Sequence, residues 1–217
     1  MTCLQVALDI VNLNRALEIA RKVIEGGADI IEVGTPLIKR YGTLPIKAIE
    51  AEFPDVKILA DSKTIDAGAI EASIMFEAGA DMMTVLGLAD NVTIAYALDV
   101  AEEFGCEIVI DLINVREVVE RALELYDFGL RNFCFHIGID IQRARKASVI
   151  TLLSEIEELK KVTNIKAFVA GGIKLKDLQH ILKAPVNVVV VGNAIIHSHD
   201  PLGATKRFKE ILKKYSG

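Results

Sequence analysis

A short motif of alternating acids and a lysine is the part of the sequence best suited to chemistry. Asp61, Lys63 and Asp66 follow the apolar run Val56–Ala60. On a strand, residues two apart share a face, so Asp61 and Lys63 are expected to point the same way. Opposite charges at a strand end keep each other ionised and oriented, which suits a reaction that builds up negative charge. The alternative is a structural ion pair, with Asp66 as the N-cap of the next helix.

Alternating strand-like and helix-like segments would position this motif. Most strand candidates are short and apolar, as expected of parallel strands that are covered on both faces. This alternation implies right-handed βαβ units, and eight of them predict a single (β/α)8 TIM barrel over residues 1–217, with an open doubly wound sheet as the alternative. About eight helices should lie between the strands, including Leu13–Glu25, Val115–Tyr126, Leu152–Val162 and Pro201–Tyr215. The expected strands are Leu4–Asp9, Ile30–Val33, Val56–Asp61, Met82–Leu86, Glu107–Asp111, Asn132–His136, Ala167–Ala170 and Val188–Val191.

An internal repeat favours the closed barrel. The segment at 27–34 resembles the segment at 79–87, with weaker copies at 132–138 and 187–192. The corresponding positions Asp29, Asp81, Asn132 and Asn187 are separated by 52, 51 and 55 residues. A period of about fifty residues corresponds to two βα units, so the sequence predicts four quarter-barrels.

Charged side chains are expected to meet at one rim, because the C-terminal ends of the strands carry the active site of such a barrel. Glu32 and Asp61 end neighbouring strands, so their carboxylates could share a hard divalent cation such as Mg²⁺, or could be neutralised by Lys63. His136 ends an apolar strand and is a candidate acid or base. The rim set is Asp9, Glu32, Asp61, Lys63, Asp111 and His136.

Two glycine-containing loops follow the last two strands. Gly171 and Gly172 come after the seventh strand, and Gly192 and Asn193 come after the eighth. Backbone N–H groups in these loops occupy the usual phosphate site of a barrel, although plain turn glycines are the alternative.

Composition narrows the class of protein. The formal charge of −5 and the pI of about 5.5 argue against nucleic acid and anionic membranes as partners. No signal peptide and no apolar run of membrane-spanning length are found. Cys3, Cys106 and Cys134 lack a metal or redox spacing, which predicts buried thiols in a reducing cytoplasm. His197 and His199 are expected in a solvated loop.

Six segments, taken in order, resemble the 3-hexulose-6-phosphate synthases of the orotidine 5′-monophosphate decarboxylase suprafamily. These segments are 4–9, 32–38, 61–66, 84–87, 136–140 and 169–173. The resemblance implies an aldolase that reversibly adds formaldehyde to D-ribulose 5-phosphate, giving D-arabino-3-hexulose 6-phosphate through a metal-stabilised enediolate. It also implies a homodimer, with Mg²⁺ or Mn²⁺ as the cofactor.

The resemblance assigns roles to the rim residues. Glu32 and Asp61 would bind the metal, and Lys63 would stabilise the enediolate. His136 would transfer protons, Asp9 and Asp111 would orient Lys63 and the sugar hydroxyls, and Asp66 would reach into the partner subunit's site. The glycine loops would hold the phosphate.

Relatives in the suprafamily differ at marker positions. Orotidine monophosphate decarboxylases have a lysine where this chain has Glu32. The 3-keto-L-gulonate-6-phosphate decarboxylases (KGPDC) typically have Glu and Arg where this chain has Asp111 and Ile139. The synthase is therefore favoured, with the decarboxylase as first alternative and a non-catalytic sugar-phosphate-binding barrel as second. Ser62 and Asn193 depart from the residues often found at their positions.

Overall fold

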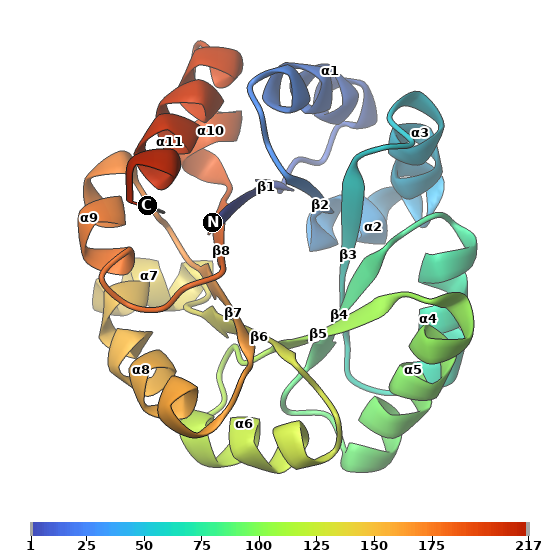
Figure 1. Cartoon of the computed structure of the whole chain (residues 1–217). Helices are drawn as coiled ribbons and strands as arrows, with labels where there is room; N and C mark the ends of the chain where they lie inside the picture. Colours follow the sequence, from blue (N-terminus) through green and yellow to red (C-terminus); the bar gives the residue numbers. More distant parts are fainter. Residues whose placement is uncertain (1, 216–217) are drawn as a thin grey trace.

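Eight parallel strands close into a barrel in the computed structural model, which describes residues 2–215. Each strand pairs with the next one in the sequence, and β8 pairs with β1, so the ring has no open edge (Figure 1). The predicted (β/α)8 barrel is confirmed, and the doubly wound open sheet is wrong. The strands are β1 (Cys3–Leu8), β2 (Ile30–Val33), β3 (Lys57–Thr64), β4 (Met82–Leu86), β5 (Glu107–Asp111), β6 (Asn132–His136), β7 (Lys166–Ala170) and β8 (Val188–Val191).

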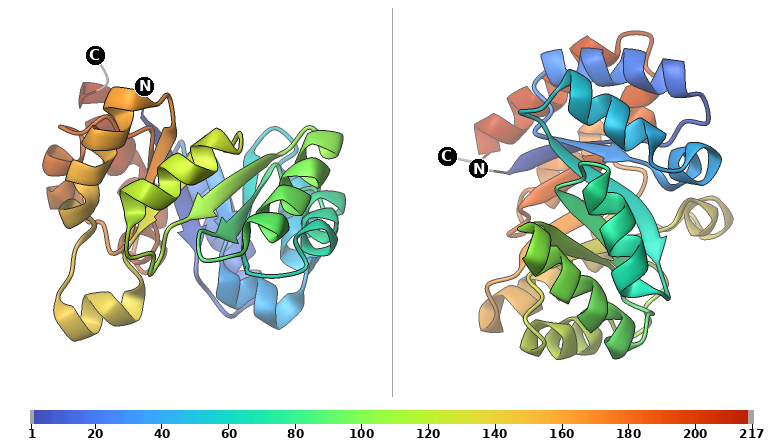
Figure 2. Two further views of the ribbon diagram at one scale, coloured as in Figure 1. Left: turned by 90° about the horizontal axis from the view of Figure 1, so that it is seen from below. Right: turned by 90° about the vertical axis from the view of Figure 1, so that its right-hand side faces the viewer.

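Helices surround the barrel, as Figures 1 and 2 show. Residues 2–215 contain eleven α-helices instead of the expected eight or so, because several connections carry a second helix. After β2, for example, Gly42 adopts a positive φ of 62° and ends one helix, and Pro45 lies in the first turn of the next.

The bounds of the helices are as follows: α1 (Leu13–Glu25), α2 (Thr35–Tyr41), α3 (Leu44–Glu52), α4 (Gly68–Glu77), α5 (Asn91–Phe104), α6 (Val118–Asp127), α7 (Ile139–Arg145), α8 (Leu153–Val162), α9 (Leu178–Ile181), α10 (Asn193–Ile196) and α11 (Pro201–Tyr215). Two 3₁₀ turns, Val149–Leu152 and Leu175–Asp177, precede α8 and α9.

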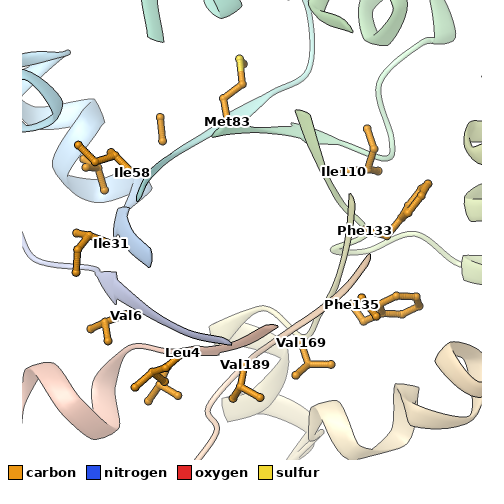
Figure 3. Packing of buried hydrophobic residues seen from close by; sticks show 14 of the residues in the cluster. Leu4, Val6, Ile31, Ile58, Met83, Ile110, Phe133, Phe135, Val169 and Val189 are labelled. Atoms are coloured by element: carbon orange, nitrogen blue, oxygen red, sulfur yellow. The ribbon is translucent and has the colours of Figure 1, made fainter. Parts of the chain in front are cut away.

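Two apolar layers hold the barrel together. Because side chains alternate along a strand, one set points outward against the helices, as Val6, Ile58 and Phe133 do in Figure 3. The other set, which includes Leu59 and Phe168, forms a second cluster of buried side chains. Strands with both faces buried need apolar residues at nearly every position, which explains the lack of alternation in the sequence.

The fifty-residue repeat has a structural reason. Asp29 and Asp81 each precede an even-numbered strand, and each accepts a hydrogen bond from a backbone N–H near the start of the strand before it. Asn187 does the same for Ala167 at 2.9 Å. Asn132 differs, because its Nδ2 donates to the carbonyl of Ile108 at 3.2 Å. These polar side chains join the strands in pairs at the end of the barrel opposite the rim, consistent with quarter-barrel units.

Within residues 2–215, no helix combines the length and the apolar character needed to cross a bilayer. All three cysteines are free thiols, with Cys134 buried but Cys3 and Cys106 only half-buried.

The outward-facing layer gives a test of the fold. Phe133 is fully buried, whereas Phe128 is 48% exposed. Phe133→Ala should lower the free energy of unfolding by about 3–5 kcal/mol, because it removes buried apolar surface and leaves a cavity. Urea unfolding followed by circular dichroism measures this change. Phe128→Ala is the matched control and should cost less than about 1 kcal/mol. Equal losses in the two variants would contradict the packing described.

Candidate active site

A cavity of about 1,090 Å³ lies at the C-terminal ends of the strands. It collects predicted site residues that are as many as 184 positions apart in the sequence, from Asp9 to Asn193. Asp111 lies beneath this cavity, where it lines a smaller one together with Lys63 and His136. Asp66 lines neither cavity. The predicted residues that line the large cavity are Asp9, Glu32, Asp61, Lys63, His136, Gly171, Gly172, Gly192 and Asn193.

An irregularity in β3 places the lysine. The strand continues to Thr64, beyond the expected end at Asp61, and its pairing with β4 shifts register between Ala60 and Thr64. Lys63 adopts a positive φ of 50°, a conformation that non-glycine residues seldom take and that often marks functional sites. Thr84 on β4 holds this irregular backbone, since its Oγ1 accepts a hydrogen bond from Lys63 N–H at 2.9 Å.

The Lys63 ammonium is held between two carboxylates. Its Nζ lies 2.8 Å from Asp111 Oδ2 and 3.1 Å from Asp61 Oδ1. Burial alone would lower the pKa of Lys63, but the charges of Asp61 and Asp111 outweigh this effect and raise its pKa above the ordinary value. The side chain therefore remains a fixed cation inside the site.

Asp111 connects the lysine to the histidine. Nδ1 of His136 lies 3.1 Å from both carboxylate oxygens of Asp111. Burial would raise the pKa of Asp111, but the hydrogen bond from His136 and the positive charges of His136 and Lys63 lower it to about 2. A carboxylate oxygen only accepts, so Nδ1 carries the proton in this pair and leaves Nε2 available for proton exchange.

Three polar residues that the sequence motifs did not single out hold the expected metal ligands. Thr35 Oγ1 donates to Asp61 Oδ2 at 2.7 Å, and Thr84 Oγ1 donates to Asp61 Oδ1 at 2.8 Å. Gln5 Nε2 donates to Glu32 Oε2 at 2.7 Å. Gln5 and Thr84 are polar residues at inward positions of otherwise apolar strands, and this was the signal that could have identified them.

The acids of the rim outnumber the positive charges near them. Burial, followed by the charges of Asp61 and Asp9, raises the pKa of Glu32 well above its usual value. Burial and the charge of Asp61 also raise the pKa of Asp9. Carboxylates that destabilise one another's charged form in this way fit a hard divalent cation, which takes oxygen ligands and neutralises them. Asp9 is also expected to help orient Lys63. Among residues 2–215, however, Asp9 makes no hydrogen bond to Lys63.

A different group of three potential ligands does not form a credible metal site. The ligand atoms of Asp111, Cys134 and His136 lie within 4.8 Å of one another. However, Asp111 already binds Lys63 and His136, and burial raises the pKa of the Cys134 thiol well above its usual value, which disfavours the thiolate needed for metal binding. His197 and His199 are exposed and, within the described part of the chain, belong to no group of this kind.

The glycine loops form the other side of the cavity. Gly171 has a φ of +124°, and a Cβ there would lie 2.6 Å from the carbonyl oxygen of Ile137, so this loop requires glycine. Cationic side chains line the same cavity, namely Arg143, Lys146 and Lys174. Arg143 belongs to α7, the gold helix that stands off from the barrel in Figure 2 and has no buried residue.

Asp66 lies outside the site of its own chain. Its side chain is exposed, and Oδ1 accepts a hydrogen bond from Ala67 N–H at 2.7 Å. Ala67, and not Asp66, is the residue that caps α4, and it does so without a side-chain hydrogen bond. The N-cap alternative for Asp66 is therefore wrong.

Known proteins with similar sequences show the family of this chain. Residues 2–208 match the family model described as the orotidine 5′-phosphate decarboxylase / HUMPS family. A 3-hexulose-6-phosphate synthase from Mycobacterium gastri is 40% identical over 209 residues, which cover 96% of this chain and 99% of that protein.

Two solved structures extend the comparison. A 3-hexulose-6-phosphate synthase from Salmonella typhimurium is 36% identical with a TM-score of 0.94, covering 99% of this chain and 100% of that one. The KGPDC from Streptococcus mutans, solved as a complex with a ligand, is 28% identical with a TM-score of 0.94, covering 100% of this chain and 99% of that one. Since the family model spans nearly the whole sequence, the chain belongs to the orotidine 5′-phosphate decarboxylase / HUMPS family.

Proposed function

We propose that this chain is a 3-hexulose-6-phosphate synthase, an aldolase that reversibly joins formaldehyde to D-ribulose 5-phosphate to give D-arabino-3-hexulose 6-phosphate. The observation that carries the proposal is the half-buried cation of Lys63, held between Asp61 and Asp111 at the floor of the large cavity. The synthases from M. gastri and S. typhimurium, similar over nearly their whole length, support the same reaction.

The chain's own residues divide the work of this reaction. Loss of a C1 proton from the sugar phosphate gives an enediolate, and Lys63 would stabilise its negative charge. The C1 carbon then bonds to the carbonyl carbon of formaldehyde, whose oxygen takes up a proton. His136, oriented by Asp111, is the proposed proton carrier. Asp9 lines the cavity where the sugar hydroxyls would lie.

Glu32 and Asp61 are the proposed ligands of Mg²⁺, or of Mn²⁺ in its place. The mutual repulsion of the rim carboxylates supports this assignment. When bound, the cation would act as a Lewis acid toward substrate oxygens. Thr35 and Thr84 would keep Asp61 in its orientation.

The substrate phosphate would bind at the glycine loops. Gly171, Gly172, Gly192 and Asn193 all line the cavity, and backbone N–H groups suit phosphate oxygens. Asn193 adds no charge, so the cationic contribution would come from neighbours such as Lys174 and Arg143.

Decarboxylation of 3-keto-L-gulonate 6-phosphate is the second candidate, favoured by the high structural similarity to the S. mutans KGPDC. That reaction would pass through an enediolate stabilised by the same residues. Asp111 and Ile139, at positions where that group typically has Glu and Arg, favour the synthase.

A homodimer is proposed as the catalytic unit, with Asp66 entering the partner subunit's site. Exposed apolar side chains near Asp66 support an interface, because such surface on packed helices marks association sites. Ile70 and Ile74, four residues apart, share one face of α4, and Val92 and Tyr96 share one face of α5. The two helices touch where Gly68 meets Thr93. The exposed residues are Ile65, Ile70, Ile74, Leu88, Val92 and Tyr96.

The proposed enzyme would consist of one barrel domain over residues 1–217 and would act in the cytoplasm. Its three free thiols would stay reduced in that compartment.

A direct assay tests the proposed reaction. The protein should consume D-ribulose 5-phosphate and formaldehyde together in the presence of Mg²⁺, as followed by loss of formaldehyde and by ³¹P NMR of the product. Removal of metal with a chelator should abolish turnover, and added Mg²⁺ should restore it. A higher kcat/KM for 3-keto-L-gulonate 6-phosphate would favour the decarboxylase. Binding of ribulose 5-phosphate without turnover under any divalent metal would favour the non-catalytic barrel.

Mixing of inactive variants tests the role of Asp66. If this residue acts across the interface, Asp66→Ala subunits combined with Lys63→Ala subunits form heterodimers that contain one intact site. Activity should then recover to about one quarter of wild type at equal, random pairing, since half the dimers are mixed and each has one working site. Kinetic assay after joint refolding measures the recovery. No recovery, despite heterodimers seen by native mass spectrometry, would place Asp66 in its own subunit's site, and full activity of Asp66→Ala on its own would place it outside catalysis.

A further inference from the structure

Gln5 is a buried amide below the proposed metal site, and the mechanism above does not use it. The residue is 2% exposed, and its Nε2 donates to Glu32 Oε2 at 2.7 Å. In the pairing of β1 with β2, Gln5 lies opposite Ile30, whereas Glu32 lies opposite Ala7. Residues two apart on a strand share a face, so Gln5 lies one inward-facing level below Glu32 and reaches up to it.

The two proposed metal ligands are held very differently. Asp61 receives hydrogen bonds from two threonine hydroxyls and from the Lys63 ammonium. The carboxylate of Glu32, in contrast, receives one from Gln5 and from no other residue in the range 2–215. The direction in which Glu32 points therefore depends on a single neighbour.

The amide oxygen of Gln5 makes no contact within residues 2–215 that would explain a polar residue at this position. Oε1 is buried and has no hydrogen-bond partner among the described residues. A buried amide whose oxygen is unpaired adds little to the free energy of unfolding. An apolar side chain of similar shape could replace it with little loss of stability. The hydrogen bond to Glu32 is the interaction that distinguishes Gln5 from such a replacement.

We infer that Gln5 is a positioning residue that fixes Glu32 for binding a divalent cation. Its N–H occupies Glu32 Oε2, which leaves Oε1 as the oxygen that can serve as a metal ligand. The inference rests on the proposed function only in taking Glu32 as a ligand. Residues that hydrogen-bond to a ligand typically change metal affinity 10- to 100-fold when they are lost.

Asn132 provides a matched control at the opposite end of the barrel. It too is a buried amide, its Nδ2 donates to a glutamate, Glu107, at 2.9 Å, and its Oδ1 has no partner among the described residues. Asn132 lines neither cavity of the site. The variants Gln5→Met and Asn132→Leu therefore remove the same kind of group at two places, only one of which bears on the proposed metal site.

Binding of Mn²⁺ to the whole protein, measured by electron paramagnetic resonance, tests the inference without reference to turnover. Gln5→Met should raise the Kd for Mn²⁺ by about 10-fold or more, as should Gln5→Asn, whose amide is one methylene too short to reach Glu32. Asn132→Leu should leave this Kd unchanged. Binding of inorganic phosphate, followed by ³¹P NMR, should be the same in all of these variants, and Gln5→Met should melt no earlier than Asn132→Leu.

The outcomes separate this inference from the proposed reaction. A Kd for Mn²⁺ that is unchanged in both Gln5 variants would overturn it, as would parallel losses of Mn²⁺ binding, phosphate binding and melting temperature. Absence of Mn²⁺ binding to the wild type, or binding that Glu32→Gln leaves intact, would overturn it as well. If the wild type binds Mn²⁺ through Glu32, with an affinity that depends on Gln5, but does not turn over formaldehyde and ribulose 5-phosphate, the inference stands and the proposed reaction fails.

Discussion

The site depends on the two ion pairs that Lys63 forms with Asp61 and Asp111. An ammonium withdrawn even partly from water is costly unless carboxylates lie close to it, and here two do so at 3.1 and 2.8 Å. Each carboxylate also has other partners, since Asp61 accepts hydrogen bonds from Thr35 and Thr84, and Asp111 accepts one from His136. Removal of the lysine charge would therefore disturb the proposed metal ligand and the proposed proton carrier together.

The barrel supplies the rigidity that this arrangement needs. Asp61, Asp111 and His136 come from three different strands, and the closed hydrogen-bonded ring fixes the distances between them. The apolar layer between strands and helices keeps water away from the backbone of those strands. Lys63 itself lies at an irregular point of β3 with a positive φ, so the rest of the ring must hold one strained residue in place.

Much of the fold and of the candidate site could be predicted from the sequence, because the apolar pattern of each strand is local and the barrel topology brings the strand ends together. Eight apolar strands implied closure, and their ends indicated which charged residues would meet, including Glu32 and His136. The remainder depends on tertiary contacts that no spacing encodes. The extension of β3 to Thr64 follows from its pairing with β4, and the partners of Gln5 and Thr84 appear only when neighbouring strands are in register. Asp66, close to Lys63 in sequence, lies outside the site of its own chain because β3 ends at Thr64 and the backbone bends at Asp66.

If Lys63 stabilises an enediolate formed from the sugar phosphate, the C1 hydrogen should exchange with solvent even without formaldehyde. Ribulose 5-phosphate would be incubated with protein and Mg²⁺ in D₂O, without formaldehyde, and followed by ¹H NMR. One C1 proton should be replaced by deuterium. This exchange should be at least about 100-fold slower in Lys63→Ala. It should be unchanged in Lys57→Ala, which alters an exposed lysine at the other end of β3. Absence of exchange in the wild type, or equal exchange in Lys63→Ala, would rule out this role of Lys63.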